Sequence, residues 1–133
     1  MRALLDVNFL LALLQPDHAH FERAHRWWDA NKVHGWASCP LTQNGFVRIV
    51  SQASYPQPLP VAQALESLAD QIVRTDHRFW PDDISLLDAD HIDGARLLGP
   101  KHLTDVYLLG LAVKNGGRLV TFDRAIPIRS VRR

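Results

Sequence analysis

The sequence predicts an α/β domain in which a mostly parallel central sheet is covered by helices on both faces. Short apolar runs that suit buried strands alternate with longer segments of helical periodicity, as in strand–helix–strand units. Two of the runs lead to an aspartate: Ala3–Leu5 precedes Asp6, and the run after Gly116 ends at Asp123. A chain of 133 residues is long enough for one hydrophobic core, so we expect a single domain spanning residues 1–133.

The first half of the chain carries signals for two strands and three helices. A short apolar helix over Phe9–Leu14 follows the first strand and is stopped by a proline. Apolar residues at helical spacing predict a helix over His18–Ala30, with Asp17 as its N-cap. After a second strand at Trp36–Ser38, a proline suited to the first turn begins a helix over Pro40–Val50.

A proline-rich connection leads into the clearest helix of the sequence. Apolar residues over Val61–Val73 follow the i, i+3, i+4, i+7 spacing of one helix face. We expect a third strand at Arg78–Trp80, closed by the next proline, and a short helix over Asp90–Leu98 that glycine and proline end. The segments before and after the proline-rich connection belong to the same domain, because neither is long enough to fold alone.

The last part of the chain combines a very apolar helix with two short strands. The helix spans Asp105–Asn115 with Thr104 as its N-cap, and its apolar residues leave little polar face, which predicts burial. Leu119 and Val120 suit a buried strand, and Ile126–Val131 is expected to add an edge strand.

Composition excludes several classes of protein. Hydrophobic residues make up 47% and charged residues 22% of the chain, which is ordinary globular usage and argues against disorder. The net charge of +1 means that a phosphate-binding surface must be a local patch. One cysteine, Cys39, cannot form an internal disulfide and favours a reducing compartment. The apolar run near the amino terminus is too short for a signal peptide or a membrane span, so we expect a cytoplasmic protein that does not enter the membrane.

Three aspartates form the candidate site. Asp6 and Asp123 follow buried strands, and Asp105 lies in the first turn of the apolar helix, where the helix dipole favours an anion. Carboxyl ends of parallel strands border the ligand crevice of an open α/β sheet. Carboxylates held close together repel one another unless a cation neutralises them, and oxygen ligands suit Mg²⁺ or, as a substitute, Mn²⁺.

Four segments, LLDVNFLLAL, LTQNGFVRI, HLTDVYLLGLA and LVTFDR, together resemble the PIN domain and, within that family, the VapC toxins of VapBC toxin–antitoxin modules. The resemblance covers nearly the whole chain in the right order. It implies a Mg²⁺-dependent endoribonuclease that cleaves RNA and is inhibited by a VapB-type antitoxin, and we expect the toxin to form a homodimer.

The resemblance also assigns roles to individual residues. Asp6, Asp105 and Asp123 correspond to acids of the catalytic metal site of the family. Asn8 and Thr121 match small polar positions that support this site. The fourth catalytic position, where the family often has glutamate, is Gln43; a neutral amide adds an oxygen but no charge, so we expect one ordered Mg²⁺.

Arg48, in the LTQNGFVRI segment, is either a supporting residue that reaches substrate phosphate or a site carboxylate, or part of a surface ion pair. Two other functions stay open. A catalytically degenerate PIN module would bind RNA or protein without cleaving, and Gln43 is the feature that favours it. A receiver-like phosphoacceptor domain also gathers aspartates around Mg²⁺, but such a domain usually has an acidic neighbour beside the first aspartate, and Asp6 has none.

Overall fold

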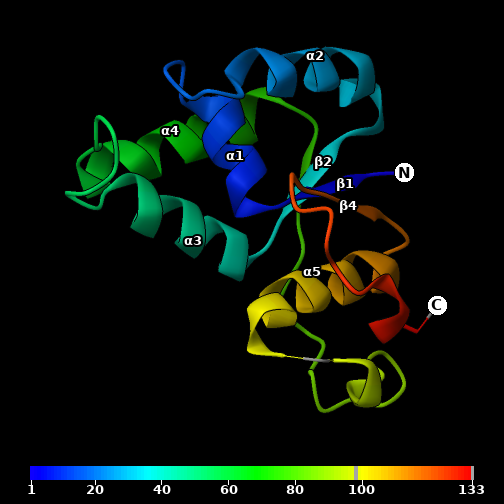
Figure 1. Cartoon of the computed structure of the whole chain (residues 1–133). Coiled ribbons are helices and arrows are strands. Elements are labelled where there is room, and N and C mark those ends of the chain that lie inside the picture. Colours follow the sequence, from blue (N-terminus) through cyan, green and yellow to red (C-terminus); the bar gives the residue numbers. More distant parts are fainter. Residues whose placement is uncertain (98, 133) are drawn as a thin grey trace.

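The computed structural model describes residues 1–97 and 99–132, and its centre is a sheet of four parallel strands (Figure 1). The strands are β1 (Ala3–Leu5), β2 (Trp36–Ser38), β3 (His77–Phe79) and β4 (Arg118–Val120). Their order across the sheet is β3-β2-β1-β4. Because Leu5 pairs with Val120, the residues that follow β1 and β4 leave the sheet side by side.

Within the described residues, five α-helices cover the two faces of the sheet. They are α1 (Val7–Leu14), α2 (Phe21–Asn31), α3 (Pro40–Val50), α4 (Val61–Arg74) and α5 (Leu103–Lys114). Figure 1 shows α1 and α5 on opposite sides of the strands. The predicted α/β architecture with a parallel sheet is therefore confirmed.

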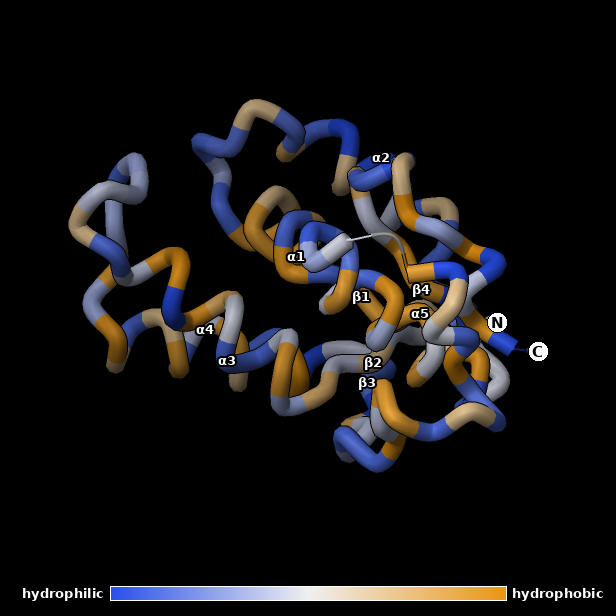
Figure 2. Tube along the Cα trace, turned by 60° about the horizontal axis from the view of Figure 1, so that its bottom comes forward, coloured by the Kyte–Doolittle hydropathy of each residue, from blue (hydrophilic) through white to orange (hydrophobic). Residues whose placement is uncertain are grey.

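Strand periodicity explains why each face of the sheet carries a hydrophobic core. Ala3 and Leu5 pack into a core with residues of α1, α2, α3 and α4, whereas Leu4 packs into a second core with residues of α5. Successive side chains of a strand point to opposite faces, so a strand that is apolar throughout must be covered twice. Figure 2 shows the corresponding mixture of hydrophobic and hydrophilic positions along α3 and α4. None of the helices among the described residues is long and apolar enough to cross a membrane.

The helix predicted over His18–Ala30 starts later than its sequence suggests, because α2 begins at Phe21. The side chain of His18 accepts a hydrogen bond from the amide of His20 at 3.0 Å, and this local bond holds a turn in place of a first helical turn. Asp17 therefore does not cap the helix, and His20 occupies that position without a side-chain bond. The prediction of Asp17 as N-cap was wrong.

The segment between β3 and α5 does not form the helix predicted over Asp90–Leu98. Where the helix was predicted, the described residues form a short 3₁₀ helix at Gly94–Arg96; a second one follows at Pro100–His102, and Leu98 lies outside the described residues. Asp88 and Asp93 accept hydrogen bonds from the amides two residues further on, at 2.9 and 3.2 Å. These turns compete with helical bonds.

The predicted last strand over Ile126–Val131 is also absent. Pro127 has no amide to donate to a sheet, and Ile128–Ser130 forms a 3₁₀ helix. Val131 makes one isolated antiparallel bridge with Ile92, so this segment packs on the loop before α5 and leaves β4 at the edge of the sheet. Thr104 lies inside α5, whose N-cap is His102.

Candidate active site

Asp6 lies directly after β1 and begins α1. Its side chain is buried, with 6% of the residue exposed, and both carboxylate oxygens accept short hydrogen bonds. The amide of Val7 donates to Oδ1 at 2.7 Å, and the hydroxyl of Thr121 donates to Oδ2 at 2.7 Å. A buried carboxylate needs such donors, and the two bonds hold it in one orientation at the carboxyl end of the sheet.

Thr121 connects the ends of β1 and β4. Besides donating to Asp6, its Oγ1 accepts from the side-chain amide of Asn8 at 3.2 Å and from the backbone amide of Asp123 at 3.1 Å. Asn8 in turn accepts from the amide of Phe122 at 3.3 Å. Of the residues predicted to support the site, Thr121 therefore bonds to Asp6 and Asp123, and Asn8 bonds to Thr121 and to the backbone just before Asp123.

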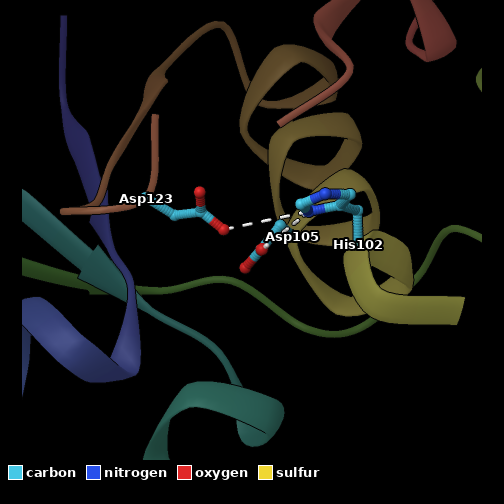
Figure 3. A group of neighbouring side chains, drawn as sticks. All are labelled: His102, Asp105 and Asp123. Carbon is cyan, nitrogen blue, oxygen red and sulfur yellow. Dashed lines mark ion pairs between the residues drawn. The ribbon is translucent and has the colours of Figure 1, made fainter. Parts of the chain in front are cut away.

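Asp105 and Asp123 face each other across the site from α5 and from the loop after β4 (Figure 3). Burial, a hydrogen bond with Asp123 and the negative charges of Asp6 and Asp123 together raise the pKa of Asp105 to about 6. The pKa of Asp123 is lowered, chiefly because the backbone amide of Ala125 donates to its Oδ1 at 2.8 Å. The pair therefore keeps a proton on Asp105 in weakly acidic solution.

His102 completes this cluster, and sequence reasoning missed it. Its Nδ1 lies 3.9 Å from Oδ2 of Asp105 and 3.8 Å from Oδ2 of Asp123, and Figure 3 shows the ring beside both carboxylates. That nitrogen is buried and has no hydrogen-bond partner among the described residues. The available signal was its position three residues before Asp105, since i and i+3 share one face at the start of a helix.

The donor set suits a metal ion. One ligand atom each of His102, Asp105 and Asp123 lie within 4.8 Å of one another, and Asp6 is close enough for its charge to raise the pKa of Asp105. Carboxylates are ligands of Mg²⁺ and Mn²⁺, and an imidazole nitrogen suits transition metals. The unpartnered nitrogen of His102 also fits this assignment, because a buried polar atom without a partner is costly.

Gln43 and Arg48 point into a different environment. The side-chain amide of Gln43 donates to Oγ of Ser38 at 2.9 Å, and the same Oγ forms a hydrogen bond with Nε2 of His77 at 2.7 Å. Gln43 and Arg48 line a groove between α3 and α4. Within the described part of the chain, no hydrogen bond or ion pair joins either residue to the three aspartates.

Comparisons with known proteins agree with this geometry. A sequence profile of the PIN domain matches residues 3–131. Ribonuclease VapC44 of Mycobacterium tuberculosis (strain ATCC 25618 / H37Rv) is 53% identical over 131 residues, which cover 98% of this chain and 92% of that protein. Ribonuclease VapC39 of the same strain is 42% identical over 127 residues, covering 95% and 91%, and Ribonuclease VapC29 is 34% identical over 126 residues, covering 95% and 89%. This chain therefore belongs to the PIN domain family and, within it, to the VapC group.

Proposed function

We propose that this chain is a metal-dependent endoribonuclease and the toxin of a type II toxin–antitoxin module. The observation that carries the proposal is the cluster of His102, Asp105 and Asp123, with Asp6 close enough that its charge raises the pKa of Asp105. Carboxylates held this close repel one another unless a cation neutralises their charge, so such a cluster is typical of a cation site. The names of the VapC relatives, each called a ribonuclease, support RNA as the substrate.

The proposal assigns the aspartates to the metal ion and the neighbouring polar residues to support. Asp6, Asp105 and Asp123 would hold Mg²⁺, for which Mn²⁺ can substitute. The bound ion supplies a Lewis acid that activates water and neutralises charge on the scissile phosphate. Asp105 must release its proton before it can bind the ion. Asn8 and Thr121 hold the carboxylate of Asp6 and the backbone of Asp123 in fixed positions by hydrogen bonds.

The test is cleavage of a labelled RNA by purified protein with Mg²⁺ and with a chelator. Asp6→Asn and Asp105→Asn should each abolish Mg²⁺-stimulated cleavage, since removing a metal-binding charge leaves the water unactivated. Asp17→Asn is the matched control, because Asp17 is exposed and takes part in none of the hydrogen bonds or ion pairs of the three aspartates. Wild-type cleavage by both site variants would contradict the proposal.

A degenerate module that binds without cleaving is the second candidate, and neutral Gln43 favours it. Gln43→Glu adds a negative charge near the carboxyl end of β2, and we expect it to tighten Mg²⁺ binding up to about tenfold by long-range attraction. Calorimetry measures the change, with Gln15→Glu as a control that adds the same charge elsewhere. A wild-type protein that binds RNA but never cleaves it would favour the degenerate module. The receiver-like alternative has no support from the comparisons, which match the PIN domain.

The groove between α3 and α4 supports the proposal of protein partners. It encloses about 740 Å³ and is lined by apolar residues such as Val47, Leu65 and Ile72; Leu65 is 55% exposed. An apolar groove of this kind suits an antitoxin of the VapB type or a second copy of the chain. Expression alone should arrest growth, and co-expression with the antitoxin should relieve the arrest. Light scattering of the purified chain tests the homodimer, and a monomer at all concentrations would exclude it.

A further inference from the structure

A second pocket lies next to the aspartate site, on the edge strand of the sheet. It encloses about 320 Å³ and is lined by residues 118–122 together with Phe9, Arg23 and Trp27. β4 ends the sheet on this side, and Phe9 of α1 and Arg23 and Trp27 of α2 form the wall of the pocket opposite the strand. Thr121 belongs to the pocket wall and also donates to Asp6, which places the pocket directly beside the proposed site of cleavage.

Aromatic rings form much of the pocket. The ring of Phe9 lies 5.1 Å from that of Phe122 and 5.1 Å from that of Trp27, measured between centroids. Outside the lining residues, the ring of His20 packs against Phe122 at 5.1 Å between centroids. Aromatic surfaces of this kind accept nucleobases by stacking, whichever base is present.

Two guanidinium groups flank these rings. Arg23 lies 5.1 Å from the centre of the Phe122 ring, and Arg118 lies 5.5 Å from that of Trp27. One nitrogen of Arg118 donates to Asn31 at 2.9 Å, whereas its Nε is buried without a partner among the described residues. The lining residues include no acid, so the charge of the pocket is positive and complementary to a phosphate.

We propose that this pocket holds one unpaired nucleotide of the RNA, adjacent to the phosphate that is cleaved. Its base packs against the aromatic rings, and its phosphate pairs with Arg23 and Arg118. The assignment rests on the proposed ribonuclease function and extends it, because it places a subsite for one nucleotide at the edge strand β4. Nucleotides of a duplex are paired and stacked on their neighbours, so they cannot enter a pocket of this kind.

The test measures RNA binding separately from cleavage. In the Asp105→Asn background, a fluorescently labelled single-stranded RNA is titrated with protein that carries Arg23→Gln or Phe122→Leu as a further change. Each change should weaken binding at least about fivefold, the lower end of the effect of one stacked base. Arg23→Gln should also reduce the slope of log affinity against log salt by about 0.7, the contribution of one phosphate contact in single strands. Arg78→Gln is the matched control, because Arg78 is exposed on β3 at the opposite edge of the sheet.

A change in the RNA provides a test that leaves the protein fold intact. Replacing the nucleotide beside the cleavage site by an abasic one should weaken binding to protein with intact Phe122 but hardly affect the Phe122→Leu protein. If Arg23→Gln and Phe122→Leu both leave RNA affinity within twofold of the background, the nucleotide pocket is excluded. If the two variants keep their RNA affinity but bind the antitoxin more weakly, the pocket is instead a protein-binding surface. If both variants bind RNA more weakly but the wild-type protein does not cleave RNA, the nucleotide pocket is confirmed and the proposed ribonuclease function is excluded.

Discussion

Replacing Asp105 by asparagine is expected to stabilise the metal-free protein while it abolishes cleavage. The pKa of Asp105 is raised from 3.8 to about 6, mainly by burial, so the folded state binds this proton more tightly than the unfolded state. Binding of this proton therefore stabilises the folded wild-type protein fully below the unfolded pKa of Asp105, and that stabilisation is lost as the pH rises through about 6. Asparagine is neutral at every pH and can still donate to Asp123.

The size of the effect follows from the two pKa values. A rise from 3.8 to about 6 corresponds to about 3 kcal/mol above neutral pH, which is an upper limit because the side chain is 18% exposed and water screens its charge. We expect a gain of about 1–3 kcal/mol in the free energy of unfolding. In a domain of this size, each kcal/mol raises Tm by about 4 °C.

Thermal unfolding followed by circular dichroism measures the effect, with chelator present to exclude metal. At about pH 7.5 the Asp105→Asn variant should melt roughly 4–10 °C above the wild type, and at about pH 5 the advantage should fall to about half. Adding Mg²⁺ should raise the Tm of the wild type only. Asp17→Asn should leave Tm within about 1 °C. A variant that melts at or below the wild-type temperature at both pH values would refute the reasoning.

Three further outcomes are expected. Thr121→Val removes the hydroxyl that donates to Asp6 and should cost about 1.5–3 kcal/mol in urea unfolding; Thr121→Ser should restore most of the loss, and a valine variant as stable as wild type would contradict the role of this bond. Mg²⁺ affinity measured by calorimetry should fall about tenfold per pH unit below about pH 6, because one proton must leave Asp105, and a flat profile would show that Asp105 binds no metal. Gly117→Ala would place a methyl group 2.6 Å from the carbonyl oxygen of Arg2 and 2.5 Å from Trp80; the clash should lower stability by about 1–3 kcal/mol, and an unchanged urea midpoint would mean that β4 shifts freely.

The local elements could be predicted from sequence wherever neighbouring residues alone decide the structure. Ala3–Leu5, Pro40–Val50 and Val61–Val73 were placed correctly or within a residue, because their apolar spacing and prolines act over a few positions. Predictions failed where short polar bonds competed with helix formation, as at His18 and Asp93. A sequence pattern does not show which of these two local arrangements has the lower free energy.

The candidate site was predicted in part for the same reason. Asp6 follows β1, Asp123 follows the half-buried strand β4, and Asp105 lies in the first turn of α5, so their positions along the chain follow from the strand and helix pattern. Tertiary structure alone brought His102 beside two of them and raised the pKa of Asp105. Both depend on distances between groups in separate elements and on burial.

The sequence by itself indicated the four strands of the sheet, the five α-helices that cover it, the three aspartates and the resemblance to the PIN domain, but it also predicted a helix before α5 and a strand after β4 that the described residues do not form. Only the tertiary structure decided that β4 is an edge strand and that Phe9, Arg23 and Phe122 meet there. Apolar periodicity is a local property, because each element buries the face that its own residues define. A site is a property of residues far apart in the chain, and its chemistry depends on which of them the sheet order and helix packing bring within a few ångströms.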